Sequence, residues 1–314
     1  MPVSDIIKKQ LSEFIVNQAK ELGFFDCGIS KAEFLHKDKE HMEWYIENGF
    51  HGEMSFLEKN KEKRYDPTKL VDGAKSVITV LYNYYPQELL RENDNYKISK
   101  YAYGTDYHYV IKEKLKKLTE IIDNKTGANV SRVFVDSAPV LDRAWAKKSG
   151  LGFVGKNTML INKKGGSYFF IGHIITSLEL NYNNTPDPKN YCGKCTRCID
   201  ACPTGAIKEN YIDSNNCLSY LTIEYRGNFD DSYEKGNFND WIYGCDICQD
   251  ICPWNRFKSP HNEPHFNPSK DLKEMSREKW DNMDKPTYKR LFKGSAVNRT
   301  RYKGLRRNID FLRE

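Results

Sequence analysis

The 314-residue sequence predicts an α+β protein built from three parts, and three observations support this fold class. Helical and strand-like hydrophobic patterns alternate from the N-terminus to about residue 180, which predicts one mixed α/β unit around a sheet. Eight of the nine cysteines then fall between residues 192 and 252, which predicts a small cysteine-rich module. The rest of the chain is basic and helical in pattern. We expect domains at 1–183, 184–258 and 259–314.

Local signals define the elements of the first unit. Ser4 can cap a helix over residues 5–22, and Gly23 can end it. Two proline-containing stretches, 181–190 and 259–268, are expected to connect the three parts. Further helices are expected at 32–48, 107–124 and 139–149, and strands at 24–29, 76–85, 132–136, 158–161 and 168–178.

Composition limits the classes of protein to which the chain can belong. Hydrophobic residues make up 39% of the sequence, and no apolar run approaches the 18 residues that a membrane-spanning helix needs. The net charge is only +6, but it is unevenly distributed. Residues 285–313 contain ten Lys or Arg and one acid, Asp310. This stretch is either a phosphate-binding surface or a solvated helical face.

The cysteines form two runs whose spacing is typical of two cubane iron–sulfur clusters. Three cysteines two residues apart can surround one cluster within a tight turn, and the fourth, just before proline, points to the other cluster. The first run is Cys192-x2-Cys195-x2-Cys198-x3-Cys202-Pro. The second run lacks its first cysteine, for which Cys217 is the available substitute. We therefore expect one [4Fe–4S] cluster on Cys192, Cys195, Cys198 and Cys252, and another on Cys202, Cys217, Cys245 and Cys248.

Zinc and disulfides are the alternatives for these cysteines. Zinc sites also use Cys-x2-Cys pairs, but they do not require two Cys-x3-Cys-Pro segments. Disulfides need an oxidising compartment, and residues 1–20 contain no apolar signal segment, so reduced thiols are expected. Cys27 stands apart in an apolar run and is expected to be a small buried side chain.

A glycine-rich loop spans residues 150–158, and its sequence superficially matches two nucleotide-binding motifs. Gly150, Gly152 and Gly155 fit the spacing G-x-G-x-x-G, but the loop follows a predicted helix and leads into a strand, the reverse of a dinucleotide-binding loop. Asn157 stands where a P-loop needs Ser or Thr. The glycines are expected to let the backbone approach a large flat ligand. The alternative is a helix C-cap followed by a tight turn.

Asp136 ends the predicted strand 132–136, next to this loop. A carboxyl group in a shielded apolar pocket can serve as a proton donor, and its pKa would be raised so that it stays protonated near neutral pH. The alternative is an N-cap for the helix predicted at 139–149. The residues alone favour the cap.

Several further motifs give the chain a specific resemblance. They are Glu62-Lys-Arg64-Tyr-Asp-Pro67, Lys100-Tyr-Ala-Tyr-Gly-Thr-Asp-Tyr-His108, Val135-Asp136, Asp142-Arg143-Ala144, Gly152-Phe-Val-Gly-Lys-Asn157 and Cys217-Leu-Ser-Tyr-Leu-Thr-Ile-Glu224. With these motifs the chain resembles, over essentially its whole length, the cobalamin-dependent epoxyqueuosine reductases, which complete queuosine at the tRNA wobble position.

The resemblance implies a nitroreductase-like α/β domain that binds base-off cobalamin, followed by a ferredoxin-like module with two [4Fe–4S] clusters and a short helical C-terminal segment. The proton donor of the family corresponds to Asp136, which reverses the preference for the cap. Expected tRNA contacts are Arg226, Arg306 and Arg307. Expected cobalamin contacts are Arg64, Tyr101, Ala102, Tyr107, His108, Asp136, Lys156, Asn157, Thr158, Leu160 and Ser219.

The implied reaction is the reduction of epoxyqueuosine to queuosine by Co(I) cobalamin, which the two clusters would reduce, with Asp136 as proton donor. The expected partners are tRNA with epoxyqueuosine in its anticodon loop and an external low-potential donor of the flavodoxin or ferredoxin type. We expect a cytoplasmic monomer. The rival functions are a cobalamin-dependent reductive dehalogenase and a non-enzymatic two-cluster electron carrier.

Overall fold

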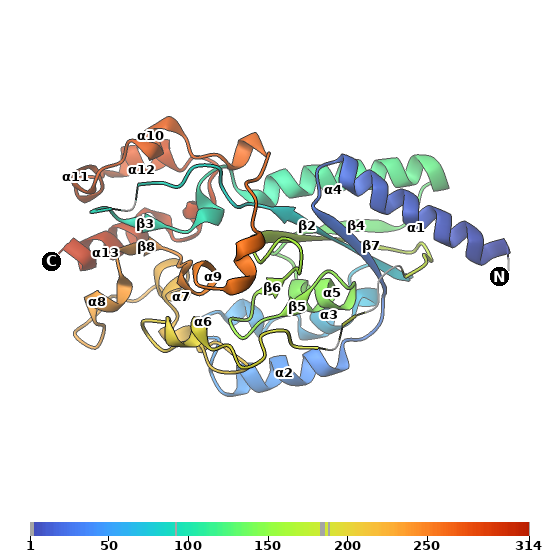
Figure 1. Cartoon of the computed structure of the whole chain (residues 1–314), viewed down its shortest axis with the longest axis horizontal. Helices are drawn as coiled ribbons and strands as arrows, with labels where there is room; N and C mark the ends of the chain where they lie inside the picture. Colours follow the sequence, from blue (N-terminus) through green and yellow to red (C-terminus); the bar gives the residue numbers. More distant parts are fainter. Residues whose placement is uncertain (1–2, 92, 183–185, 188, 314) are drawn as a thin grey trace.

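The computed structural model describes residues 3–91, 93–182, 186–187 and 189–313, and its centre is a four-stranded sheet (Figure 1). The strands lie in the order β1 (Asp26–Lys31), β2 (Ser76–Asn83), β7 (Phe169–Thr176) and β4 (Ser131–Phe134). Every neighbouring pair is antiparallel. The chain is therefore an α+β protein, as the sequence predicts.

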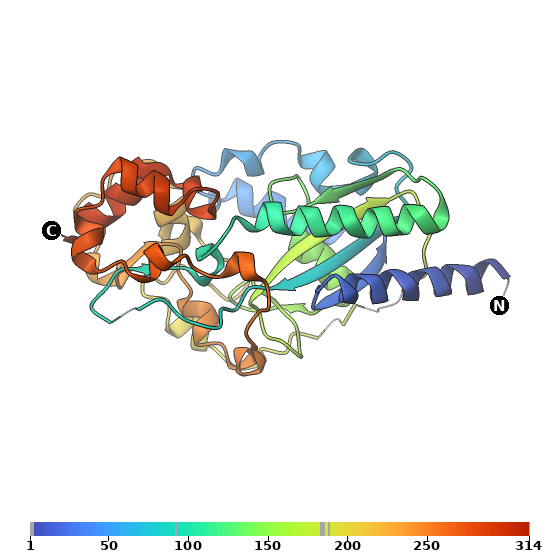
Figure 2. The same ribbon diagram turned by 90° about the horizontal axis from the view of Figure 1, so that it is seen from above.

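Helices cover both faces of this sheet. The two long helices α1 (Val3–Glu21) and α4 (Tyr107–Thr126) lie side by side on one face, which Figure 2 shows from above. The shorter α5 (Asp142–Lys148) packs on the other face. Strand β2 serves both layers because its side chains alternate in direction: Ile78 and Val80 pack toward α1 and α4, whereas Val77 and Leu81 pack toward α5.

The structure contains a helix or strand of the predicted type in each of these regions, but the first and last residues differ from the prediction. Helix α4 begins at the predicted residue and ends two residues later than predicted. Helix α5 begins at Asp142, three residues later than expected, because residues 138–140 form a tight turn in which Val140 N–H donates to Ala138 O. The expected strand 158–161 is only β6 (Leu160–Ile161), which pairs with β5 (Phe153–Val154) in a separate hairpin.

Short elements connect the sheet to the rest of the chain. They are α2 (His36–Glu47), α3 (Lys61–Tyr65) and the 3₁₀ turns η1 (Ser55–Leu57), η2 (Pro67–Lys69) and η3 (Lys100–Ala102). The cysteine-rich module follows, with α6 (Arg197–Asp200), η4 (Ser214–Asn216), α7 (Leu218–Ile223), α8 (Lys235–Phe238), β8 (Trp241–Tyr243), α9 (Ile247–Asp250) and η5 (Pro253–Phe257).

The C-terminal segment is helical, as predicted. It contains η6 (Pro264–Phe266), α10 (Lys270–Lys273), α11 (Arg277–Asp281), α12 (Lys285–Leu291), η7 (Ala296–Arg299) and α13 (Arg301–Arg313). Its helices surround a second hydrophobic core that includes Trp280, Phe292 and Leu305.

This second core draws on all three predicted parts of the chain. Strand β3 (Lys97–Ile98) belongs to the first part of the sequence but pairs in parallel with β8 of the cysteine-rich module. Ile98 of β3 and Ile242 of β8 are both buried in the core beneath the C-terminal helices. The stretch 259–268 also packs back on the first unit, where Phe266 joins the core under α1 and α4. The parts are therefore interleaved in space.

Two further expectations concern particular segments. The expected connection at 181–190 falls partly outside the described residues. Cys27 is confirmed as a buried side chain in the core of the first unit, where burial raises its pKa to about 12. Among the residues that the structure describes, no helix is long and apolar enough to cross a membrane.

Candidate active site

Asp136 lies in the loop that connects β4 to α5 and takes part in a compact network of polar groups. Tyr107 Oη, at the start of α4, donates to Asp136 Oδ2 at 2.5 Å. Nε2 of the adjacent His108 lies 3.4 Å from the same oxygen. The backbone of Asp136 is left-handed, with φ +48°, a conformation that a residue with a Cβ adopts at a cost of roughly 1–3 kcal/mol. The side chain is 61% exposed, so solvent still reaches the carboxylate.

His108 connects Asp136 to a second carboxylate. Its Nδ1 lies 2.7 Å from Asp106 Oδ1, and Asp106 also caps α4 by accepting from the His108 backbone N–H at 3.0 Å. Partial burial lowers the pKa of His108, but the two carboxylates outweigh that effect and raise it to about 9. The imidazole is therefore protonated at neutral pH and lies between two carboxylates.

The expected raised pKa of Asp136 is wrong for this arrangement. Desolvation by the surrounding protein is the largest single effect and raises this pKa, but the interactions with His108 and Tyr107 lower it. The positive charges of His108 and Arg299 add to this effect, so the pKa of Asp136 lies below its ordinary value. Asp136 is consequently a carboxylate here, and the titratable proton resides on His108.

The helix-cap interpretation of Asp136 is also wrong. The N-cap position of α5 is Leu141, whose side chain makes no capping bond. Because α5 begins after the tight turn at 138–140, Asp136 is too far from its first turn to cap it. The side chain is thus available for chemistry.

Aromatic side chains form one wall beside Asp136. The ring of Tyr107 stacks on Phe170 of β7, with centroids 4.1 Å apart and planes 7° apart. Tyr101 meets Tyr107 edge to face at 6.1 Å and donates to the hydroxyl of Tyr243 at 3.2 Å. Tyr243 in turn donates to Ala296 O at 2.7 Å. The wall therefore fixes the Asp136 network relative to the cysteine-rich module and the C-terminal segment.

An arginine from the C-terminal segment also lies near the network. Arg299 pairs with Glu224 through two hydrogen bonds of 2.8 and 2.9 Å. Arg226 donates to Arg299 O at 3.0 Å, and 47% of the Arg226 side chain remains exposed. Sequence analysis missed Arg299, because it comes from a stretch read only as a basic segment.

The glycine-rich loop owes its glycines to its own hairpin. A Cβ at Gly152 would lie 2.3 Å from Ile161 O, and a Cβ at Gly155 would lie 2.6 Å from Ile161 Cδ1. Gly150 follows α5 with φ +70°, as a helix C-cap does. The cap-and-turn alternative therefore accounts for these glycines, and the approach of a flat ligand to the loop stays a prediction.

The same loop holds neighbouring elements in place. Asn157 Nδ2 donates to Cys248 O at 3.1 Å, which ties the loop to the cysteine-rich module. Arg143, from α5, donates to Thr158 O at 2.6 Å and to Thr158 Oγ1 at 2.9 Å. The sequence motif Asp142-Arg143 indicated no role for Arg143. In the structure the Arg143 side chain holds the backbone of Thr158 in place through these hydrogen bonds.

The side chains expected to contact cobalamin fall into two groups. Ala102, Asn157, Leu160 and Arg64 are at least 92% buried, and Leu160 packs in the core with Leu81 and Leu151. Because their side chains are buried, these residues can contact cobalamin only through backbone atoms or the few side-chain atoms at the surface. The side chains that remain partly accessible around Asp136 and the glycine-rich loop are Tyr101, Tyr107, His108, Lys156, Thr158 and Ser219. This second group suits a large ligand with many polar edges.

Electrostatic interactions among the eight module cysteines mostly follow the two predicted sets of four, with one interaction, between Cys248 and Cys198, across the sets. Cys198 interacts electrostatically with Cys192, Cys195 and Cys252. Cys245 interacts in the same way with Cys217 and Cys202, and Cys248 with Cys245 and Cys217. All eight are free thiols. The structure thus brings together residues from both runs in each set.

The chemistry of these sets fits iron–sulfur clusters. Burial raises the pKa of Cys198, Cys217 and Cys252, so ionised thiolates at these positions need metal ions to stabilise them. Within the described residues, no three His, Cys, Asp or Glu side chains converge closely enough to hold a single metal ion. A cubane cluster holds its thiolates farther apart than one zinc ion does.

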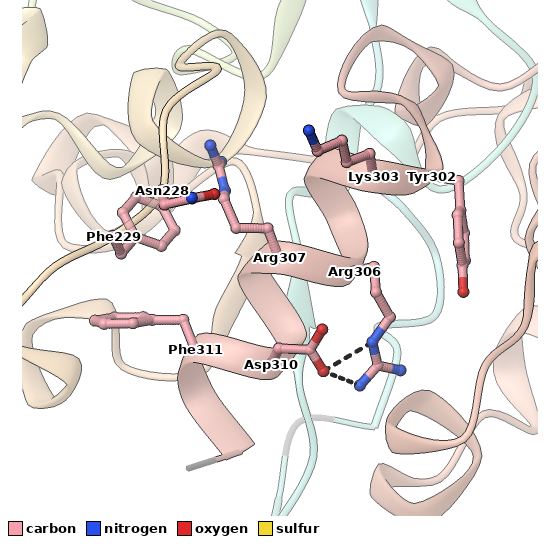
Figure 3. Close-up of a pocket in the computed structure, with 8 residues that line it drawn as sticks. All are labelled: Asn228, Phe229, Tyr302, Lys303, Arg306, Arg307, Asp310 and Phe311. Carbon is pink, nitrogen blue, oxygen red and sulfur yellow. Dashed lines mark hydrogen bonds and ion pairs between the residues drawn. The ribbon is translucent and has the colours of Figure 1, made fainter.

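Arg306 and Arg307, expected to contact tRNA, line a surface pocket and are also bonded to neighbouring parts of the protein. Figure 3 shows both on α13, with Arg306 paired to Asp310. Arg306 also donates to Asp281 O at 2.7 Å, and Arg307 donates to Tyr225 O at 2.9 Å and Leu221 O at 2.8 Å. Burial lowers the pKa of Arg307 to about 10. Both guanidinium groups hold α13 against its neighbours.

Comparisons with known proteins agree with these features. Residues 64–137 match a family model described as epoxyqueuosine reductase QueG, DUF1730, and residues 191–255 match a 4Fe-4S double cluster binding domain. The chain is 50% identical over 307 residues to an epoxyqueuosine reductase of Cellulophaga algicola, covering 98% of this chain and 99% of that one. It is 48% identical to the epoxyqueuosine reductase of Cyclobacterium marinum, with 96% of each chain covered.

Solved structures show the same similarity. A structure of epoxyqueuosine reductase with an epoxyqueuosine-modified tRNA-Tyr stem loop has a TM-score of 0.88 and 28% identity, and covers 96% of this chain and 80% of that one. The Bacillus subtilis enzyme, in a form whose catalytic aspartate loop is swung out of the active site, has a TM-score of 0.87 and 27% identity, covering 96% and 81%.

Proposed function

The chain belongs to the epoxyqueuosine reductase family, and from this membership we propose that it reduces epoxyqueuosine to queuosine at the wobble position of tRNA. The overall change removes the epoxide oxygen as water and therefore consumes two electrons and two protons. The observation that carries the proposal is the Tyr107–Asp136–His108 network, because it offers a proton beside an accessible, aromatic-walled site.

The cysteine-rich module supplies the electrons. It binds two 4Fe–4S clusters, and the proposed ligands are Cys192, Cys195, Cys198 and Cys252 for one, and Cys202, Cys217, Cys245 and Cys248 for the other. The hydrogen bond from Asn157 to Cys248 O sets the module directly against the loop beside Asp136. Each cluster passes one electron at a time, so the pair can deliver the two that the reaction needs.

Base-off cobalamin is the proposed cofactor of the accessible site, within a nitroreductase-like domain. When bound, it supplies a low-valent cobalt that can reduce the epoxide-bearing carbon. The partly accessible side chains of Tyr101, Tyr107, Lys156, Thr158 and Ser219 would hold it. Backbone N–H groups of Ser219 and Tyr220 interact with the Cys217 sulfur, so Ser219 lies beside the proposed second cluster.

Asp136 and His108 would share the handling of the proton. Because the pKa of His108 is raised to about 9, His108 carries the proton at neutral pH, and its Nε2 forms an ion pair with Asp136 Oδ2 at 3.4 Å. A bound cofactor and nucleoside would cover the 61% of the Asp136 side chain that is exposed, and this desolvation raises the pKa of a carboxyl group. The proton can then move from His108 Nε2 to Asp136 Oδ2, from which it reaches the leaving oxygen. The second proton that completes the water comes from solvent.

The remaining partners follow from the reaction. An external low-potential donor of the flavodoxin or ferredoxin type would reload the clusters, and the protein would act as a monomer in the cytoplasm, where its tRNA substrate is found. Among the expected tRNA contacts, the exposed Arg226 is retained, whereas Arg306 and Arg307 are not.

Activity on RNA tests this proposal directly. The anaerobically reconstituted protein, supplied with cobalamin, a low-potential reductant and an anticodon stem loop containing epoxyqueuosine, should yield queuosine on nucleoside mass spectrometry. Omission of cobalamin should abolish the product and thereby separates this enzyme from a simple electron carrier. No queuosine from protein with full clusters and bound cobalamin would refute the proposal.

A further inference from the structure

A cavity of about 390 Å³ lies on the outer side of the loop that carries Asp136. Its floor is the end of β4 together with the following loop, from Val133 to Pro139, without Asp136 itself. Its walls come from α3, η2 and α4. None of the residues assigned to the proposed reaction lines it.

The walls of this cavity carry only positive charge. Lys63, Lys69, Lys112 and Arg132 line it, and no acidic side chain does so within the described part of the chain. Across the described ranges, none of the three lysines forms an ion pair. Arg132 is fixed because its Nη1 donates to Leu70 O at 2.9 Å and its guanidinium lies 5.2 Å from the centroid of the Phe134 ring. Four cations around one polar cavity attract an anion, and they repel one another without it.

The cavity also shares its floor with the catalytic loop. Val135, Ser137 and Pro139 line it, while Asp136 between them points to Tyr107 on the other side. A ligand in the cavity would therefore contact α3, α4 and this loop together. Because Asp136 holds a left-handed conformation that costs free energy, such a ligand would help to keep the loop in its working position.

We propose that this cavity binds a phosphodiester group of the tRNA anticodon arm, and that this contact holds the Asp136 loop in place. The inference rests on the proposed function, because it takes RNA as the substrate. RNA presents closely spaced phosphates, and lysines that neutralise them release counterions and gain affinity at low salt. A phosphate of the bound RNA would then contact the Asp136 loop and help to hold it in its working conformation.

The test replaces Lys63, Lys69 and Lys112 together by glutamine and measures the affinity of an anticodon stem loop for the reconstituted holoenzyme across a range of salt concentrations. The slope of log affinity against log salt should fall by about one for every phosphate that the variant no longer neutralises. We expect a loss of affinity on the order of 10-fold or more near 0.1 M salt, and a lower kcat at saturating RNA.

Two matched variants make the result specific. Replacement of the exposed Lys9, Lys20 and Lys117, far from the loop on α1 and α4, by glutamine removes the same charge and should leave the slope nearly unchanged. The Lys63→Arg, Lys69→Arg and Lys112→Arg triple keeps the charge and should retain binding.

Three outcomes would overturn the inference. The first is an equal loss of slope in the cavity and control variants. The second is an unchanged salt slope in the cavity variant. The third is a loss of cobalamin affinity with normal RNA binding, which would assign the cavity to the phosphodiester of the cofactor tail. Turnover by the wild-type enzyme separately tests the proposed function, so the two failures can be told apart.

Discussion

In the reaction we propose, the cysteine-rich module and the Asp136 site carry the two halves, and they are encoded in different ways. Seven of the eight proposed ligands of the module lie in two short runs, with Cys217 between them, and their spacing predicts which thiols share a cluster. The partners of Asp136 come from the start of α4 and from η7, and Phe170 of β7 supports one of them, Tyr107. The electron site is thus readable from local sequence, whereas the proton site exists only once distant elements have packed.

The two regions also differ in how they hold charge. Burial raises the pKa of five module thiols, those of Cys198, Cys217, Cys245, Cys248 and Cys252, so these groups depend on metal ions to ionise. Asp136 is exposed and its pKa is lowered by donors, so it is ionised without any ligand. Loss of a ligand should therefore damage the structure of the module, but a change at the proton site should leave the fold intact.

The largest effect is expected from the module. Cys202→Ala should remove the cluster that also uses Cys217, Cys245 and Cys248, although Cys202 ends the other run. Iron should fall from about eight to about four per chain, and turnover should fall to background because one electron-transfer centre is lost. Cys27→Ala should retain all the iron. Zinc in place of iron, or loss of the first cluster instead of the second, would contradict the assignment of Cys202 to the second cluster.

The next largest effect is expected from a mutation at the contact between the two regions. Lys100, from η3, is buried, and its Nζ lies 3.4 Å from Asp246 Oδ2 and 2.9 Å from Asp250 Oδ1. Asp246 stands in the sequence between Cys245 and Cys248. Lys100→Met would leave Asp246 buried without its cation, at a cost of about 3–5 kcal/mol in unfolding free energy. Lys97→Met, which breaks a hydrogen bond to Asn239 O, should cost less than about 1 kcal/mol. Equal stability of the two variants in denaturant would show that the regions are not coupled through Lys100.

A smaller effect should come from the wall of the proton site. Tyr107→Phe keeps the stacking on Phe170 but removes the donor to Asp136, so the pKa of Asp136 should rise and kcat should fall by roughly 10-fold, the value of a hydrogen bond to a charged group. Cluster content and RNA affinity should not change. Tyr109→Phe, at a 64% exposed position of the same helix, is the control. A fall in iron content would show that the site is less independent of the module than we propose.

The smallest effect concerns stability against pH. Because the folded-state pKa of His108 is raised to about 9, its contribution to stability is full below about pH 6.5 and is lost as the pH rises through about 9. The difference in unfolding free energy between wild type and His108→Gln, on the order of 1 kcal/mol, should thus shrink above pH 9. His41→Gln, at an exposed position, should show no such change. A difference that is constant between about pH 6 and 10 would mean that His108 is not paired as described.

The same contrast explains what the sequence could predict. Helices α1 and α4 have strong apolar periodicity, and the sequence predicts their bounds within a few residues. The expected cap of α1 is wrong, because the helix begins at Val3 and Ser4 lies inside it. The environment of Asp136 could not be predicted, because the apolar strand before it suggests a shielded pocket while its donors come from elsewhere. Arg306 and Arg307 read as surface charge, since nothing local reveals the backbone carbonyls that accept from them.

Single-turnover conversion by Asp136→Asn tests the central claim most directly. Wild-type and variant enzyme, both with full clusters and cobalamin reduced beforehand, are mixed with the epoxyqueuosine stem loop, and queuosine is followed by mass spectrometry. The electron site is loaded in advance, so only the proton step differs. We expect the variant to bind RNA and cobalamin as tightly as wild type and to lose rate by on the order of 10²-fold or more. A rate close to wild type, with an intact fold, would show that Asp136 does not deliver the proton.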